Sequence, residues 1–147
     1  MKKFKFSLES VLMVKEKNLE DERLALAKAM NYLNEQKEIL AKLNNELTKT
    51  EAALENYSIE EQMNVVVYES YLNYINKLNK KIVQQMDNIK KAALEVNKQQ
   101  IKTKEAYIGV KTLEKLKEKQ KESYNREVMM EEFKLIDDIV NSRRIAI

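Results

Sequence analysis

Leucines recur at every seventh position along the first third of the chain. The column comprises Leu12, Leu19, Leu26, Leu33, Leu40, Leu47 and Leu54. A seven-residue repeat held over this length is typical of a left-handed α-helical coiled coil. We expect the helix that carries it to run from about residue 7 to about residue 56, with the hydroxyl of Ser7 capping its first turn.

A second column with the same period follows in the later part of the chain and is mostly β-branched. It comprises Ile75, Ile82, Ile89, Val96, Thr103 and Val110, with support expected from Leu78, Met86, Ala92, Ala93, Tyr107 and Leu113. We expect a second helix from about residue 67 to about residue 141. If the chain folds back, Leu47 aligns with Ile75 and Leu26 aligns with Val96. The sequence therefore predicts an all-α fold, a long antiparallel two-helix coiled coil that forms an α-helical hairpin.

The corner between the helices is expected between about residues 56 and 67. Ser58 and Glu61 have the spacing of a capping box, in which serine caps the new helix and glutamate reaches back. The run Val65 to Val67 has low helix propensity, so a short helix or a loop is expected before the second helix settles. The whole chain, residues 1–147, is expected to form a single elongated coiled-coil domain.

The second helix is predicted to be longer than the first. At equal rise per residue, about thirty residues at its end have no partner within the hairpin. This overhang keeps a helical apolar pattern, which comprises Tyr124, Val128, Phe133, Ile136 and Ile139. We expect the overhang either to be disordered alone or to dock its apolar stripe on another protein.

Composition argues against catalysis. The chain has no cysteine, histidine, proline or tryptophan, and its single glycine is Gly109. Without histidine the serines lack the usual base, and without thiolate or imidazole ligands a zinc or haem site is not expected. One glycine cannot build a phosphate-binding loop. The consecutive acidic residues Glu20 to Glu22 point in different directions on a helix and do not converge on one ion. We expect that the chain is not an enzyme and that it has no catalytic residues, no metal site and no cofactor.

The charges are nearly balanced, with 27 basic and 24 acidic residues. Basic residues gather between Lys98 and Arg126, but glutamates alternate with them at helical spacing. This pattern favours a solvated surface that faces acidic partners over a nucleic-acid site. A filter-binding titration without salt-sensitive affinity would exclude nucleic acid. The apolar run Val11 to Val14 is too short for a signal peptide or a membrane helix, so the chain is expected to stay soluble where it is made.

The aromatic residues near the start of each helix have two interpretations. In the first, Phe6 staples onto the helix that follows it, and Tyr68, Tyr71 and Tyr74 pad the hairpin end. In the second, these side chains are contact points for another protein, because aromatic residues dominate interface energetics. The sequence favours neither interpretation.

Four short motifs follow one another in a defined order along the chain. They are Phe4-x-Phe6-x-Leu8-x-x-Val11-Leu12, then Tyr71-Leu72-x-x-Ile75-x-x-Leu78, then Lys115-Leu116-Lys117-Glu118-Lys119 with Tyr124, and finally Lys134-x-x-Asp137-Asp138. In this order and spacing the chain resembles the FliJ family, the small soluble component of the flagellar type III protein export apparatus. The likeness covers essentially the whole chain. Its last motif is similar to the Asp-Glu ending of the family, with aspartate in place of glutamate.

The resemblance implies a cytoplasmic protein of flagellum biogenesis, and so of motility and chemotaxis, associated peripherally with the inner face of the cell membrane at the flagellar base. It implies binding at the centre of the hexameric export ATPase FliI, like the central stalk of rotary ATPases. It also implies contact with the cytoplasmic domain of the export gate protein FlhA and an escort role for export chaperones.

The gate-contacting residues of the family correspond to Tyr71, Ile75 and Leu78 in this chain. The other partner-binding residues that we expect lie near the two ends of the chain. They are Phe4, Phe6, Leu8, Phe133 and Ile136.

The leading hypothesis is a non-catalytic stalk and chaperone escort, a mostly monomeric hairpin that couples the ATPase ring to the export gate. The alternative is a structural or tethering coiled-coil protein outside flagellar export, including a stalk of the related injectisomes, which share the architecture. Light scattering separates the two, because a tether that pairs between molecules forms a stable dimer or a higher oligomer.

Overall fold

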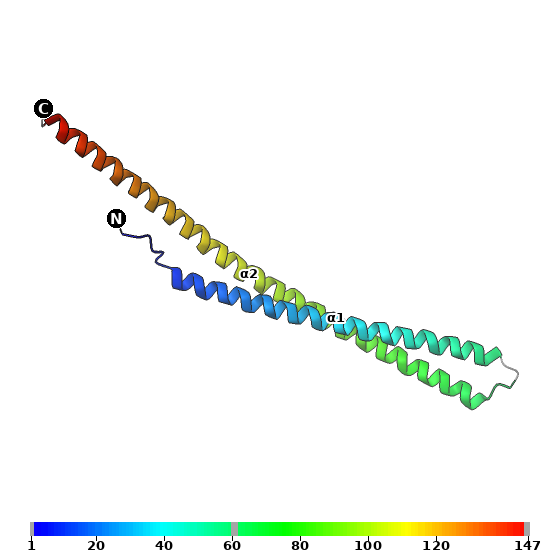
Figure 1. The fold of residues 1–147 in the computed structure, drawn as a ribbon. Coiled ribbons are helices and arrows are strands. Elements are labelled where there is room, and N and C mark those ends of the chain that lie inside the picture. Colours follow the sequence, from blue (N-terminus) through cyan, green and yellow to red (C-terminus); the bar gives the residue numbers. More distant parts are fainter. Residues whose placement is uncertain (1, 60–61, 146–147) are drawn as a thin grey trace. The chain divides into compact units, whose positions relative to one another are not determined.

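The protein is an all-α helical hairpin. The computed structural model describes residues 2–59 and 62–145, in which two long helices pack against each other. Helix α1 spans Glu9–Ile59 and helix α2 spans Val65–Ile145. The two helices run in opposite directions (Figure 1), and no β-strand occurs in the described residues. The predicted fold class is confirmed.

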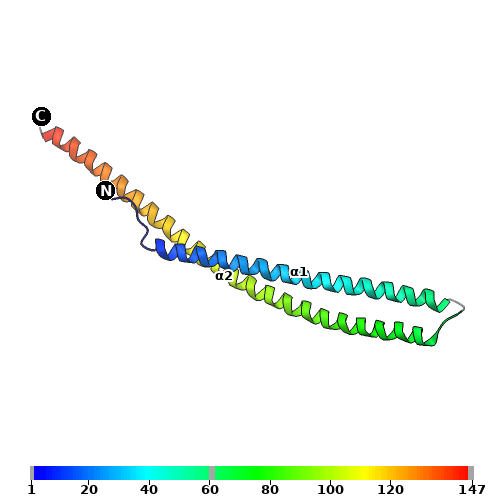
Figure 2. The ribbon, with the colours of Figure 1, turned by 60° about the horizontal axis from the view of Figure 1, so that its bottom comes forward.

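Packing divides the hairpin into two compact units, each with a stretch of both helices. The first unit comprises Met1–Glu22 and Thr103–Ile147, and the second comprises Arg23–Lys102. Inside the second unit, α1 and α2 lie side by side in both views (Figures 1 and 2). That residues 1–147 act as a single domain stays a prediction.

In the second unit, each helix turns two columns of side chains toward its partner. The leucine column of α1 and the β-branched column of α2 are buried or half-buried, as the sequence predicts. A mixed column of small, polar and apolar residues lies beside each of them. The mixed columns comprise Ala29, Gln36, Leu43, Thr50 and Tyr57 on α1, and Leu78, Gln85, Ala92 and Gln99 on α2, all buried or half-buried.

Two residues that were expected to support the β-branched column do not. Met86 is 54% exposed and Tyr107 is 44% exposed. Each follows directly after a buried residue, Gln85 or Ala106. One residue turns an α-helix by about 100°, so both side chains rotate out of the contact face.

Hydrogen bonds between the helices define which residues of the second unit lie opposite each other. The Tyr74 hydroxyl donates to Oε1 of Glu46 at 3.1 Å. Nε2 of Gln85 donates to the backbone oxygen of Gln36 at 2.8 Å. Both pairs lie one or two residues from the predicted alignment of Leu47 with Ile75.

An apolar cluster holds the start of α1 against α2 in the first unit. Its buried members are Phe6, Leu12, Leu19, Ala106 and Val110, with Phe4, Leu8 and Leu113 packed against them. Beside the cluster, Lys117 Nζ forms an ion pair with Glu9 Oε2 at 2.8 Å. Thr103 Oγ1 donates to the backbone oxygen of Glu22 at 3.2 Å. One polar contact therefore lies alongside the apolar cluster, and the other lies past its last member on α1, Leu19.

Gly109 lies inside α2 in this unit, and no close approach requires it. A Cβ at this position would meet Lys15 Cδ at 3.8 Å, which is an ordinary van der Waals contact. Glycine in a helix interior costs about 1 kcal/mol relative to alanine. The helix therefore tolerates this glycine and gains no packing from it.

The predicted cap of the first helix, Ser7, is wrong, and the helix begins two residues after the expected position of about residue 7. The backbone N–H of Leu12 donates to the Leu8 carbonyl at 2.9 Å, so Leu8 and not Ser7 occupies the capping position. The N–H of Glu9 donates to the Phe6 carbonyl at 3.2 Å and closes a turn ahead of the helix. Phe6 is buried in the apolar cluster, and its burial fixes where this turn forms.

The predicted capping box at the corner is also wrong. Ser58 lies inside α1, and its hydroxyl donates back to the Glu55 carbonyl at 2.8 Å. Glu61, the other member of the predicted box, lies outside the described residues.

Asn64 is the residue that caps α2. Its Oδ1 accepts the backbone N–H of Val66 at 2.9 Å, and its carbonyl accepts the N–H of Tyr68 at 3.0 Å. The N–H of Asn64 donates to the Tyr57 hydroxyl at 2.8 Å. The valine run begins the helix directly after this cap, with Val65 63% exposed.

The last part of α2 is helical and exposed, but it starts later than predicted. Tyr124 was expected in the overhang, yet its ring packs on Phe4 at 5.6 Å between centroids, and its hydroxyl donates to the Lys2 carbonyl. The residues before α1 are not helical, and non-helical chain spans up to about 3.3 Å per residue against 1.5 Å in a helix. The N-terminal segment therefore reaches further along α2, and residues 131–145 are the exposed part.

Candidate functional site

The expected contact residues near the N-terminus belong mainly to the apolar cluster of the first unit. Phe6 is 7% exposed, while Phe4 and Leu8 are half-buried and pack against the cluster. Burial of Phe6 commits its side chain to stabilising the hairpin. Phe4 and Leu8 keep part of their surface in solvent.

The expected contact residues early in α2 lie at two different depths in the second unit. Leu78 is 3% exposed and belongs to the core. Ile75 is half-buried in the β-branched column. Tyr71 is half-buried, and its ring packs on the ring of Tyr57 at 5.8 Å between centroids. Of these three residues, Tyr71 is the one that lines a surface groove.

That surface is an open groove of about 510 Å³ between α1 and α2. It is lined by Lys49, Thr50, Ala53, Val67, Ser70, Tyr71 and Tyr74. Tyr74 is held by its hydrogen bond to Glu46, and Tyr71 by its contact with Tyr57. Two positioned aromatic rings in a groove can receive an apolar side chain of another protein. This is the aromatic groove of the second unit.

The expected contact residues near the end of α2 form a separate exposed face in the first unit. Phe133 is 61% exposed and Ile136 is 55% exposed. Met129 lies four residues before Phe133 and is 55% exposed, and Val140 lies four residues after Ile136 and is 42% exposed. Steps of four, three and four place all four side chains on one side of a helix. These residues form the C-terminal apolar face.

A family model described as flagellar FliJ protein matches residues 4–146. The chain belongs to the FliJ family. The family is a non-enzymatic component of flagellar protein export, and this FliJ-family chain is therefore a flagellar protein associated with the export apparatus. No curated protein and no solved structure matches the chain.

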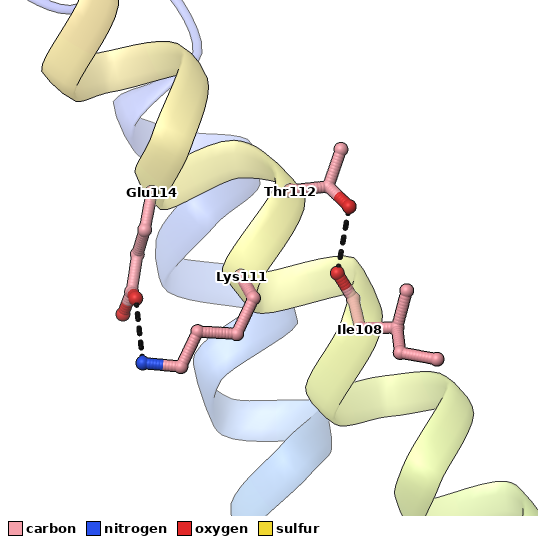
Figure 3. A network of polar contacts seen from close by, with 4 residues as sticks. All are labelled: Ile108, Lys111, Thr112 and Glu114. Carbon is pink, nitrogen blue, oxygen red and sulfur yellow. Dashed lines mark hydrogen bonds and ion pairs between the residues drawn. The ribbon is translucent and has the colours of Figure 1, made fainter.

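Several lysines in the basic stretch of α2 in this FliJ-family chain form ion pairs with glutamates of α2 or of α1. Lys111 Nζ lies 3.1 Å from Glu114 Oε2, and in the same turn Thr112 Oγ1 donates to the Ile108 carbonyl at 2.8 Å (Figure 3). Lys98 Nζ pairs with Glu95 at 3.5 Å. Glutamates within reach lower the local positive potential, in line with a solvated basic surface.

Sequence reasoning missed the polar members of the mixed columns and the polar partner of Tyr74. Gln85 is 7% exposed, and a glutamine in a core is not expected from an apolar pattern. A usable signal is present, because Gln85 stands seven residues after Leu78 and seven before Ala92. For Glu46 the sequence gives no such signal, since its contact with Tyr74 depends on the hairpin register.

Tyr74 should ionise at a higher pH than an isolated tyrosine. The hydrogen bond to the Glu46 carboxylate raises the pKa of the phenol above its usual value of 10.0, and the negative charge of Glu46 adds to this. The contact favours the protonated phenol, so it stabilises the hairpin at neutral pH and is lost as the pH rises through the raised pKa. The contribution of Tyr74 to the phenolate absorbance is the difference between the parent and a Tyr74→Phe variant. We expect this difference to titrate above pH 10.

The control is Glu46→Gln, which keeps an acceptor and removes the charge. In that background the titration of Tyr74 should move back toward the ordinary value. A midpoint that is the same with glutamate and glutamine would contradict the assigned contact.

Proposed function

We propose that this FliJ-family chain is a non-catalytic stalk and chaperone escort that binds the export ATPase FliI and couples it to the export gate protein FlhA. The observation that carries the proposal is the presence of two separate apolar surfaces, one in each packing unit. A protein that joins two partners needs two such surfaces, whereas a catalyst needs a pocket that excludes water.

The C-terminal apolar face is the proposed ATPase-binding surface. Phe133 and Ile136 are more than half exposed, and no residue of α1 lies at their level in the described part of the chain. A helix with a large exposed apolar face lowers its free energy by entering a groove or ring of another protein. The acidic pair Asp137 and Asp138 lies between Ile136 and Val140 in the sequence and gives the face a polar rim.

The aromatic groove is the proposed gate-binding surface. Tyr71 supplies an anchored ring at its wall, and Ile75 lies one helical turn further along the same side of α2. Leu78 supports the two from the core and reaches a partner only indirectly. Aromatic side chains whose rotamers are already restrained lose little entropy on binding.

Location at the membrane is part of the proposal. In the described residues neither helix has an apolar stretch long enough to cross a membrane. We propose that the chain is cytoplasmic and that its contact with the membrane-bound gate holds it at the inner face of the cell membrane. The family assignment to flagellar export disfavours a tethering role outside that system.

Replacing Tyr71 and Ile75 with alanine should weaken binding to the cytoplasmic domain of FlhA by at least about tenfold. Both side chains are half-buried, so circular dichroism should still report a helical hairpin. The matched control is Leu72→Ala, which removes a 40% exposed residue between them on a different side of α2. Isothermal titration gives the affinities; equal affinity for the parent and the double variant would remove the gate from the aromatic groove.

A further inference from the structure

The two regular columns of the second unit do not define a unique alignment of the helices. Leucines recur every seven residues on α1 and β-branched residues recur every seven on α2. A slip of seven residues therefore places another leucine opposite each isoleucine. The corner would move by only about three or four residues, into the run Val65 to Val67, whose low helix propensity makes it easy to unwind. A second feature must select the observed register.

The mixed columns contain a polar pair, buried Gln85 and half-buried Gln36, that depends on the register. Gln85 Nε2 donates to both Oε1 and the backbone oxygen of Gln36, each at 2.8 Å. Gln85 Oε1 accepts from Asn88 Nδ2 at 3.2 Å. Because Gln85 is only 7% exposed, protein groups and not water satisfy its amide.

Side chains at the neighbouring levels are matched in this register alone. Counting seven residues along each helix from the glutamine pair places Leu78 at the level of Leu43 and Ala92 at the level of Ala29. A slip of seven residues toward the corner would bring the buried glutamine to the level of Leu43. Its amide would lose the Oε1 partner, and an unsatisfied buried amide is strongly disfavoured.

We propose that the pair of buried Gln85 and half-buried Gln36 sets the register of the hairpin and thereby assembles the aromatic groove. The groove takes Thr50 from α1 and Tyr71 from α2, so a slipped register would not bring its two walls together. A polar pair at a buried coiled-coil position fixes alignment by penalising every register in which it is not satisfied. This inference is independent of the export function.

The test measures the alignment directly with two spin labels in the full chain. The chain has no cysteine, so Lys42→Cys and Asn97→Cys give two unique attachment points, both exposed and within the second unit. The two sites are offset along the helices, so a slip of seven residues toward the corner shortens their separation by up to about 10 Å. The parent should give one narrow distance distribution in pulsed electron resonance, and Gln85→Leu should add a second, shorter population.

The matched control is Gln84→Leu, which makes the same change at an exposed neighbour and should keep the single parental distance. Gln36→Leu removes the other partner and should give the same second population as Gln85→Leu, so the test stands if one variant fails to fold. The proposal is overturned if both variants keep the single parental distance, or if Gln84→Leu gives the second population as well.

Discussion

Replacing Leu12 with alanine lowers the free energy of unfolding of the hairpin by about 2 to 3 kcal/mol. Leu12 is 3% exposed and belongs to the apolar cluster of the first unit, to which α2 contributes Ala106 and Val110. A two-helix core has no third layer to relax into the space that a leucine leaves, so the cavity term adds to the lost transfer free energy. Urea unfolding followed by circular dichroism measures the change.

The matched control for this prediction is Leu24→Ala. Leu24 is also in α1 but is 58% exposed, so its removal should change the free energy of unfolding by less than about 0.5 kcal/mol. Equal losses in the two variants would mean that the apolar cluster does not hold α1 against α2.

Replacing Phe133 and Ile136 together with alanine weakens binding to the export ATPase by at least about thirtyfold, which corresponds to about 2 kcal/mol. These two residues supply the largest and the central side chains of the C-terminal apolar face. Buried aromatic and aliphatic anchors carry most of the free energy in helix-in-groove binding. Titration of the chain into the assembled FliI hexamer measures the affinity.

The stability of the double variant shows whether weaker ATPase binding comes from the lost side chains or from unfolding of the hairpin. Because both side chains are more than half exposed, the double variant should unfold at the parental urea concentration. Leu94→Ala removes a comparably exposed apolar side chain, 57% exposed, in the second unit and should leave ATPase binding unchanged. If Leu94→Ala weakens binding as much as the double variant does, the C-terminal apolar face is not the ATPase-binding surface.

The regular columns made the hairpin predictable from sequence. The column from Leu12 to Leu54 and the column from Ile75 to Val110 each repeat every seven residues, and helices in water must bury such stripes. Their equal period also predicted the alignment to within one or two residues of the observed contacts of Tyr74 and Gln85.

The helix ends were less predictable, because several residues near each end can serve as caps. Ser58 and Asn64 both have side chains that accept a backbone N–H. The hairpin decides between them through the Tyr57 hydroxyl, which accepts the N–H of Asn64, a contact between residues seven apart in sequence. Capping rules describe a single helix end and contain no term for such a contact.

The candidate sites were predictable only in part, because a core and an interface use the same residue types. Phe6 and Leu78 were each expected both as packing residues of the hairpin and as partner contacts, and they are 7% and 3% exposed. Phe133 and Ile136 were expected to be unpaired because the second helix outruns the first, and they are exposed. The length of each helix therefore predicts exposure better than the chemistry of a single side chain does.

We expect one chain to bind the ATPase and the gate at the same time through different surfaces. Size-exclusion chromatography with light scattering, on a mixture of the chain, the FliI hexamer and the cytoplasmic domain of FlhA, tests this directly. With the parent chain we expect a single species whose mass contains all three proteins. The groove variant should leave only the complex with the ATPase, and the C-terminal variant should leave only the complex with the gate domain. Only binary complexes with the parent chain, with the gate domain displacing the ATPase, would contradict it.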